Sequence, residues 1–194
     1  STVWYTTNLF RGIYNVRAVA MDSAGNESFS ATSPYEKPNA LPQVGVIIPS
    51  SGSSAPGEEQ IFTTTYLDED GWEDIYITWL YIQRDGSEGY FWGKYNPNVN
   101  KVYVRTDDNN AWTTGVTPGV TNPDGTDKII DTNSNYSLNC TKTEIYGSGN
   151  TMTIKWAATF KEPCSGNTYD SKLRAYDDTT ASTSLITKGT WSVE

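Results

Sequence analysis

Two runs of β-branched and aromatic residues flank one acidic turn between Ile61 and Ile82, and this stretch restricts the fold most strongly. Such runs favour a pleated sheet. Every second residue of the first run falls on one face, namely Phe62, Thr64 and Tyr66. The second run is apolar on both faces, which predicts a central strand. Between the runs, DEDGWED supplies Asp side chains and Gly71, which are typical of a turn.

The remaining sequence carries the same period of two and no sustained 3.6-residue apolar period. The chain has 194 residues, of which 36% are hydrophobic and 13% aromatic, so it can bury a core. We therefore predict an all-β fold, an antiparallel immunoglobulin-like β-sandwich. The predicted inward residues of the larger domain are Phe62, Ile75, Ile77, Trp79, Ile154, Trp156, Phe160 and Leu173.

Charge and residue usage exclude several classes of partner. The formal net charge is −9, which disfavours nucleic acid and anionic membrane surfaces. The chain contains no histidine, the commonest general base and transition-metal ligand. No apolar run approaches the roughly 20 residues of a membrane span.

The sequence divides into two domains in tandem. Residues 1–32 predict three strands, at Val3–Thr7, Ile13–Met21 and Glu27–Thr32. Residues 33–43 are Pro-rich and predict a stiff linker. Residues 44–194 form the second domain, in which the Ser/Gly-rich segment 49–59 is expected to be a loop. The chain opens inside a strand without a signal peptide, so we expect a piece of a larger protein.

The segment WYTTNLFRGIYNVRAVAMDSAGNES resembles the last three strands of a bacterial immunoglobulin-like or fibronectin type III domain. The resemblance implies that the first domain is incomplete. Its apolar face, formed by Tyr14, Val16, Ala18 and Ala20, then needs a cover. The missing strands of the parent protein, the second domain, or strands of another copy could provide it by β-augmentation.

Residues 43–194 resemble a module that recurs in large bacterial and metagenomic surface proteins. The resemblance rests on PSSGSS, the acidic DGWED turn, GSGNTMTIKWAATFK and the terminal GTWSV. It implies a secreted immunoglobulin-like sandwich beside other such domains, and it implies no activity. The chain departs from the usual pattern near 116–127, which we expect to be loop.

Three sets of residues are candidates for special chemistry. Cys140 and Cys164 are the only cysteines, and in a surface protein such a pair predicts one disulfide, with free buried thiols as the alternative. Asp68, Asp70 and Asp74 supply oxygens suited to calcium, although the full D-x-D-x-D-G spacing and a distal Glu are missing.

Aromatic residues form the third set. Tyr90 and Trp92 in a hairpin, and Trp112 in a long loop, could stack on sugar rings, whereas the alternative is that they brace the core.

We expect no catalytic residues and no enzyme. Acidic residues could form a glycosidase pair, but acidic turns on a solvated surface explain them without any chemistry. The expected function is a non-catalytic extracellular or cell-surface module with a structural or adhesion role, including a subunit of a fibre or surface layer. Its partners would be other surface-protein domains or copies of itself. The alternative is a carbohydrate-binding module of a secreted enzyme, with polysaccharide as partner.

Overall fold

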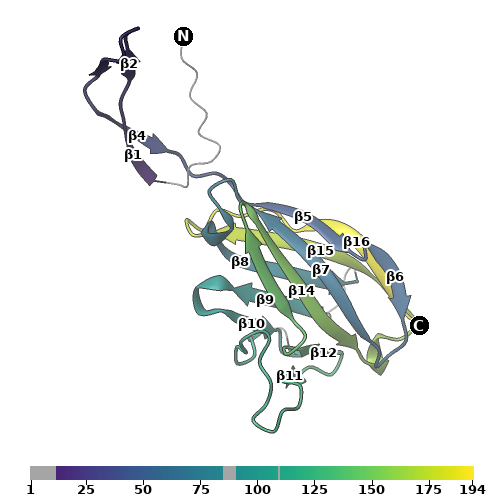
Figure 1. Cartoon of the computed structure of the whole chain (residues 1–194). Helices are drawn as coiled ribbons and strands as arrows, with labels where there is room; N and C mark the ends of the chain where they lie inside the picture. The colour runs from purple at the N-terminus through teal and green to yellow at the C-terminus, as the bar shows by residue number, and fades with distance from the viewer. Residues whose placement is uncertain (1–11, 85–90, 109) are drawn as a thin grey trace. The chain divides into compact units, whose positions relative to one another are not determined.

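A computed structural model describes residues 12–84, 91–108 and 110–194. The chain divides into two compact units, Ser1–Ala40 and Leu41–Glu194, and each is described by itself (Figure 1). The predicted strand Val3–Thr7 lies outside the described residues.

The described part of the first unit is a two-stranded ribbon. Strand β1 (Gly12–Val16) pairs antiparallel with β4 (Ser33–Lys37), and β2 (Val19–Met21) pairs antiparallel with β3 (Glu27–Phe29). Asp22 stabilises the turn between β2 and β3, because its Oδ1 accepts backbone N–H bonds from Ala24 and Asn26. The predicted linker 33–43 therefore begins with a paired strand.

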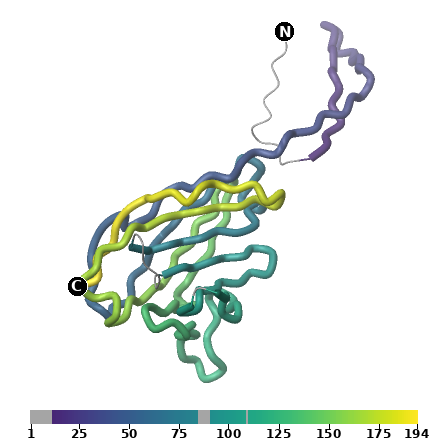
Figure 2. The backbone as a smooth tube through the Cα atoms, turned by 180° about the vertical axis from the view of Figure 1, so that it is seen from behind, coloured from purple at the N-terminus to yellow at the C-terminus, as the bar shows by residue number. Residues whose placement is uncertain are grey.

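The second unit contains two facing β-sheets, seen from opposite sides in Figures 1 and 2. The first sheet has the order β10 (Lys101–Val104), β9 (Phe91–Asn96), β8 (Ile75–Gln83), β15 (Asn167–Asp177), β16 (Ile186–Val193) and β6 (Ser51–Ser54). The second has the order β11 (Ile129–Ile130), β12 (Tyr136–Asn139), β14 (Thr151–Phe160), β7 (Glu59–Leu67) and β5 (Gln43–Ile48). Strand β13 (Glu144–Ser148) also pairs with β14. This arrangement confirms the predicted all-β sandwich.

Helical structure is limited to single short turns in the described residues. They are the 3₁₀ turns η1 (Trp72–Asp74), η2 (Pro97–Val99) and η3 (Glu162–Cys164). The turn η1 follows Gly71, whose φ of 114° is a conformation that side chains disfavour. The sequence-based prediction of a glycine-dependent acidic turn between β7 and β8 is therefore confirmed.

The core lies between the two sheets and agrees with the predicted alternation on β7 and β14. Every second residue of β7, namely Phe62, Thr64 and Tyr66, is fully buried. On β14 the predicted inward residues Met152, Ile154, Trp156, Ala158 and Phe160 are buried, and Ala157 of the opposite face is buried as well. The indole Nε1–H of Trp156 donates to the hydroxyl of Thr64 at 3.0 Å, which satisfies both buried groups.

The predicted inward face of β8 is partly wrong. Ile75 is buried as expected, but Ile77 and Trp79 are only partly buried, whereas Leu80 and Ile82 are fully buried. The pairing with β15 shifts by one residue between Ile75 and Ile77. Because a one-residue shift moves the following side chains to the opposite face, Trp79 lies on the outer surface of the sheet.

The predicted loop at 49–59 contains a strand, which corrects that expectation. Residues of β6 pair in parallel with β16, from Ser51 opposite Thr190 to Ser54 opposite Val193. The Ser54 hydroxyl also accepts a hydrogen bond from the Trp191 indole at 3.2 Å. Small residues suit this strand because a side chain at Gly52 would collide with the Trp191 ring.

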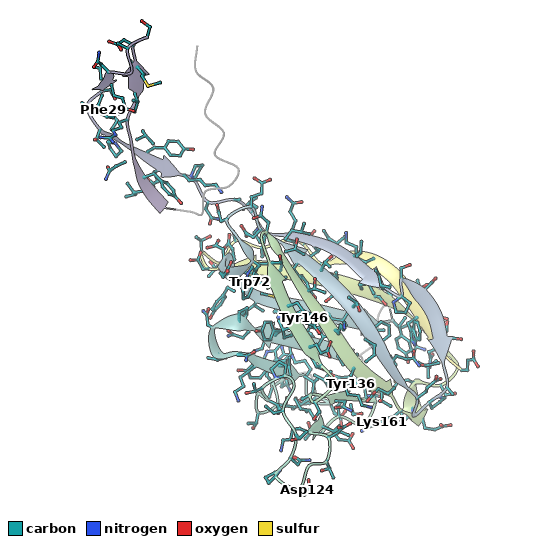
Figure 3. The ribbon with its side chains drawn as sticks, viewed as in Figure 1. Phe29, Trp72, Asp124, Tyr136, Tyr146 and Lys161 are labelled. Atoms are coloured by element: carbon teal, nitrogen blue, oxygen red, sulfur yellow. The ribbon has the colours of Figure 1, made fainter. Side chains whose placement is uncertain are left out.

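The long segment between β10 and β11 is a loop, as predicted. Two backbone hydrogen bonds of 2.8 and 3.0 Å join Val102 and Val116 and fasten the loop to β10. At its tip lies Asp124, whose carboxylate accepts a bond from the Thr126 N–H (Figure 3).

Candidate functional site

The outer surface of the first sheet carries aromatic and cationic side chains. Strands β10, β9, β8 and β15 turn alternate residues outward, and these outward residues form two rows across the sheet. The first row holds Tyr103, Lys94, Trp79 and Arg174. The second row holds Arg105, Trp92, Tyr81 and Lys172. All eight are partly exposed. Rings and cations alternate along the first row, whereas in the second row two neighbouring rings lie between two cations.

Ring contacts hold this surface together. Tyr81 stacks on Trp92, with ring centroids 4.4 Å apart and planes inclined by 29°. Trp79 meets Trp92 edge-on at 5.4 Å. Trp112, from the long loop, lies 5.1 Å from Trp92 and 6.4 Å from Trp79. We call the two rows together with Trp112 and Tyr176 the aromatic–cationic face.

The cations of this face lie against aromatic rings. The Arg105 guanidinium is 4.3 Å from the Trp92 ring centroid and 4.6 Å from that of Trp112. The Lys94 ammonium is 4.2 Å from the Tyr103 centroid and 4.4 Å from that of Trp112. Such contacts stabilise by about 0.5–2 kcal/mol each, more when desolvated. The arrangement therefore fixes both the rings and the charges.

Burial changes the acid–base properties of this face. Burial, followed by the nearby charge of Arg105, lowers the pKa of Lys94 from its ordinary value. Burial also raises the pKa of Tyr81 well above its ordinary value. Tyr81 is consequently a neutral phenol at physiological pH, and the positive charge of the face comes from its Lys and Arg side chains.

The loop places Trp112 on the sheet through backbone contacts. Arg105 and Trp112 form an isolated antiparallel bridge, and the Thr113 N–H donates to the Val104 carbonyl at 3.0 Å. The structure thus brings together Trp92 and Trp112, two of the three predicted sugar-binding residues. Tyr90 lies outside the described residues.

Sequence reasoning missed the other members of this face. Because β8 is apolar on both faces, its sequence predicts a core position for Trp79. Arg105 and Arg174 are separated by 69 positions in the sequence, and only strand pairing brings them to one surface. The available signal is a cationic or aromatic residue at every second position of Lys101–Arg105 and Lys172–Tyr176.

A second group of side chains lies at one end of the sandwich. One carboxylate oxygen from each of Asp68, Asp74 and Asp177 lies within 4.8 Å of the other two, and we call these residues the acidic cluster. Asp68 follows β7, Asp74 ends η1 and Asp177 ends β15. Two of the three predicted calcium ligands therefore meet, and Asp177 takes the place expected for Asp70.

The surroundings of Asp68 disfavour its charge. Its side chain is buried, and its Oδ1 accepts a bond from the Asp70 N–H at 2.9 Å. Burial and then the negative charges of Asp74, Asp70 and Asp177 raise the pKa of Asp68 to about 6. Like charges in a low-dielectric environment produce this effect.

The predicted disulfide between Cys140 and Cys164 is not formed, and both residues are buried free thiols. The Cys164 sulfur lies 3.2 Å from the Asn135 carbonyl, just before β12, whereas Cys140 follows the opposite end of that strand. Five extended residues span about 16 Å. A disulfide needs Cα atoms roughly 4.4–6.8 Å apart, so the strand keeps the two sulfurs separate.

No protein-family model matches the chain, and a comparison with curated proteins also found no match. Within the described residues, every helix is too short and polar to cross a membrane.

Proposed function

We propose that the chain is a non-catalytic module of a large extracellular or cell-surface protein, with an adhesive role, and that its aromatic–cationic face binds polysaccharide. One observation carries the proposal. Four aromatic rings and four cations share one surface across four neighbouring strands, and Trp112 from the loop completes it.

The face matches the chemistry of sugars. The apolar face of a pyranose ring stacks on an aromatic ring, and Trp and Tyr provide large apolar surfaces with polar edges. Four strands span about 14 Å at the usual spacing between strands, which suits a short stretch of a polymer better than a single ring. The occupant we propose is therefore an oligosaccharide segment of a longer chain.

The cations favour sugars that carry carboxylates. Arg105 and Arg174 present planar guanidinium groups, which bind carboxylates through two parallel hydrogen bonds. Nucleic acid also combines rings with negative charge, but duplex DNA carries one charge per about 1.7 Å, and the chain has a net charge of −9. A uronic-acid polysaccharide carries at most one carboxylate per sugar ring, so its charges lie further apart along the polymer than those of duplex DNA, and we favour it over nucleic acid.

Intrinsic tryptophan fluorescence tests the proposal. The protein is titrated with a uronic-acid polymer, a neutral β-glucan and single-stranded DNA. We expect a saturable change with the uronic-acid polymer that is lost in Trp92→Ala and Trp112→Ala. Tyr146→Ala, a half-exposed aromatic residue on β13 of the other sheet, is the matched control and should bind normally.

A charge variant distinguishes the contribution of ring stacking to binding from that of ionic contacts. Arg105→Gln should weaken binding of the acidic polymer at least tenfold and change binding of the neutral polymer little. No saturable signal with either polysaccharide, or binding unchanged by Trp92→Ala, would contradict the proposal. Tighter binding of DNA than of polysaccharide would assign the face to nucleic acid instead.

The ribbon of the first unit favours a second role, association with neighbouring domains or with copies of the chain. Ile13 and Met21 are 74% and 69% exposed on this ribbon, and Phe29 is 48% exposed. Exposed apolar side chains on a two-stranded ribbon favour pairing with further strands. Light scattering of the wild type should then detect self-association that Ile13→Lys or Met21→Lys abolishes. Monomers at high concentration would rule out self-association and leave other domains as partners.

A further inference from the structure

The geometry points to a calcium site formed by Asp68, Asp74 and Asp177 where the ends of β7, η1 and β15 meet. These residues come from three elements, and Asp177 lies more than 100 positions from the other two in the sequence. Their carboxylate oxygens approach one another within 4.8 Å, with two of the side chains buried. The inference does not depend on the ligand of the aromatic–cationic face.

A second observation at Asp68 points to a cation. Its side chain is only 1% exposed, and its Oδ2 is buried without a hydrogen-bond partner among the described residues. Leaving a buried carboxylate oxygen uncompensated is costly, because it has lost its hydration. A bound cation would satisfy that oxygen.

The distances and the donor type suit calcium. Calcium takes six to eight oxygen ligands at about 2.3–2.6 Å, so oxygens on opposite sides of the ion lie about 4.6–5.2 Å apart. The mutual separation of up to 4.8 Å in the acidic cluster fits within one such shell. All three donors are carboxylates, which hard cations prefer.

Hydrogen bonds from the following turn orient Asp177 toward the cluster. Its Oδ1 accepts bonds from the Thr179 N–H at 2.9 Å, the Thr179 hydroxyl at 2.8 Å and the Ala181 N–H at 2.9 Å. The Asp178 N–H also donates to the Asp74 carbonyl at 3.0 Å, which joins this turn to η1. The backbone thus holds two of the ligands together before any ion binds.

The electrostatics agree with this assignment. Three carboxylates lie close together and two of them are buried, so the charged cluster is unfavourable by itself. A divalent cation reverses that preference by stabilising the carboxylates. Because Asp68 follows a strand of one sheet and Asp177 ends a strand of the other, bound calcium would tie the two sheets together at this end.

Thermal unfolding of the whole chain is the first test. The protein is dialysed against EGTA and then supplied with calcium or, as the control ion, magnesium. Extracellular calcium modules bind with Kd values of about 10⁻⁴–10⁻³ M, so about 10 mM calcium should raise Tm by about 3–10 °C. Magnesium should raise it much less, because it demands shorter and more regular coordination.

Isosteric variants locate the effect. Asp177→Asn and Asp68→Asn should each abolish the calcium-dependent shift. Asp124→Asn removes the same charge at the tip of the long loop and should keep the full shift. In EGTA, Asp68→Asn should be at least as stable as the wild type, since it removes repulsion inside the cluster.

Terbium luminescence gives a readout that does not depend on stability. Trp72 lies in η1 together with Asp74, so its excitation should sensitise terbium bound at the cluster. Calcium should displace this signal from the wild type, and Asp177→Asn should lack it. An unchanged Tm with calcium, or a shift and a terbium signal that persist in Asp177→Asn, would overturn the assignment.

Discussion

The hydroxyl of Tyr66 crosses the interior of the sandwich and donates a hydrogen bond to the backbone carbonyl of Trp79, with 3.1 Å between the two oxygens. Tyr66 belongs to β7 and Trp79 to β8, so the bond joins the two sheets. The Tyr136 hydroxyl makes a second such bond to the Arg105 carbonyl, also at 3.1 Å. Both acceptors belong to residues whose side chains form the aromatic–cationic face. Hydrogen bonds from two buried tyrosines therefore fix the backbone beneath that face.

Tyr66→Phe should lower the free energy of unfolding by about 1–2 kcal/mol, because the hydrogen bond to the Trp79 carbonyl is lost while the packing volume stays nearly constant. Urea denaturation measures the difference. Tyr146→Phe removes a hydroxyl from a half-exposed position and should change stability by less than about 0.5 kcal/mol. Equal losses in the two variants would contradict a structural role for the bond across the sandwich.

Alkaline pH should destabilise the protein through its buried tyrosines. Burial raises the pKa of Tyr66 and of Tyr136 well above the ordinary value near 10. The folded state therefore retains protons that the unfolded chain releases, so stability is complete below pH about 10 and falls as the pH rises above it. Urea midpoints between about pH 8 and 12 should fall together with the appearance of phenolate absorbance. Titration of all tyrosines near pH 10 without loss of structure would disprove this.

Trp156 and Trp79 should differ sharply in their effect on stability. Trp156 is fully buried between the sheets, so Trp156→Ala should lower the free energy of unfolding by about 3–5 kcal/mol. Trp79 lies on the outer face, and Trp79→Ala should cost clearly less. Calorimetric melting of both variants tests the faces assigned to β8 and β14. A near-native Tm for Trp156→Ala would refute the assignment.

Both cysteines should be free. Titration of the denatured, unreduced protein should find two thiols per chain. In the native protein both should react slowly, because burial raises the pKa of Cys140 to about 12 and that of Cys164 in the same direction, and the thiolate is the reactive form. If no thiols are found after denaturation without reductant, the predicted disulfide is present and the free thiols of the structure are wrong.

The sequence predicts strands best where one face is apolar and the other polar. On β14 the predicted inward face from Met152 to Phe160 is confirmed, and Ala157 is the one residue of the opposite face that is also buried. On β8 both faces are apolar, so the direction of Trp79 depends on a register shift opposite Tyr176, which belongs to another strand. The sequence of β8 alone therefore does not predict the register shift.

In the candidate sites, too, residues close together in the sequence were predictable, whereas those brought in by distant strands were not. Asp68 and Asp74 share one turn, and their spacing identified them, whereas Asp177 enters the cluster only through the pairing of β15 with β8. Trp92 and Trp112 are recognisable by residue type, but the gathering of cations around their rings depends on pairing across four strands. Strand β6 was missed because its Ser and Gly residues favour a loop, and its partner β16 lies more than 130 positions away.

The parallel pairing of β6 with β16 has a mechanical consequence. Strand β6 lies near the start of the second unit and β16 at its end, and they run in the same direction. A pull applied at Leu41 and Glu194 would draw the two strands past each other along their length. The hydrogen bonds between them, along with the 2.9 Å bond from the Thr190 N–H to the carbonyl of Ser50 just before β6, would then bear the load together. This geometry makes the unit resist stretching in shear, where an antiparallel pair pulled from one end would open one bond at a time.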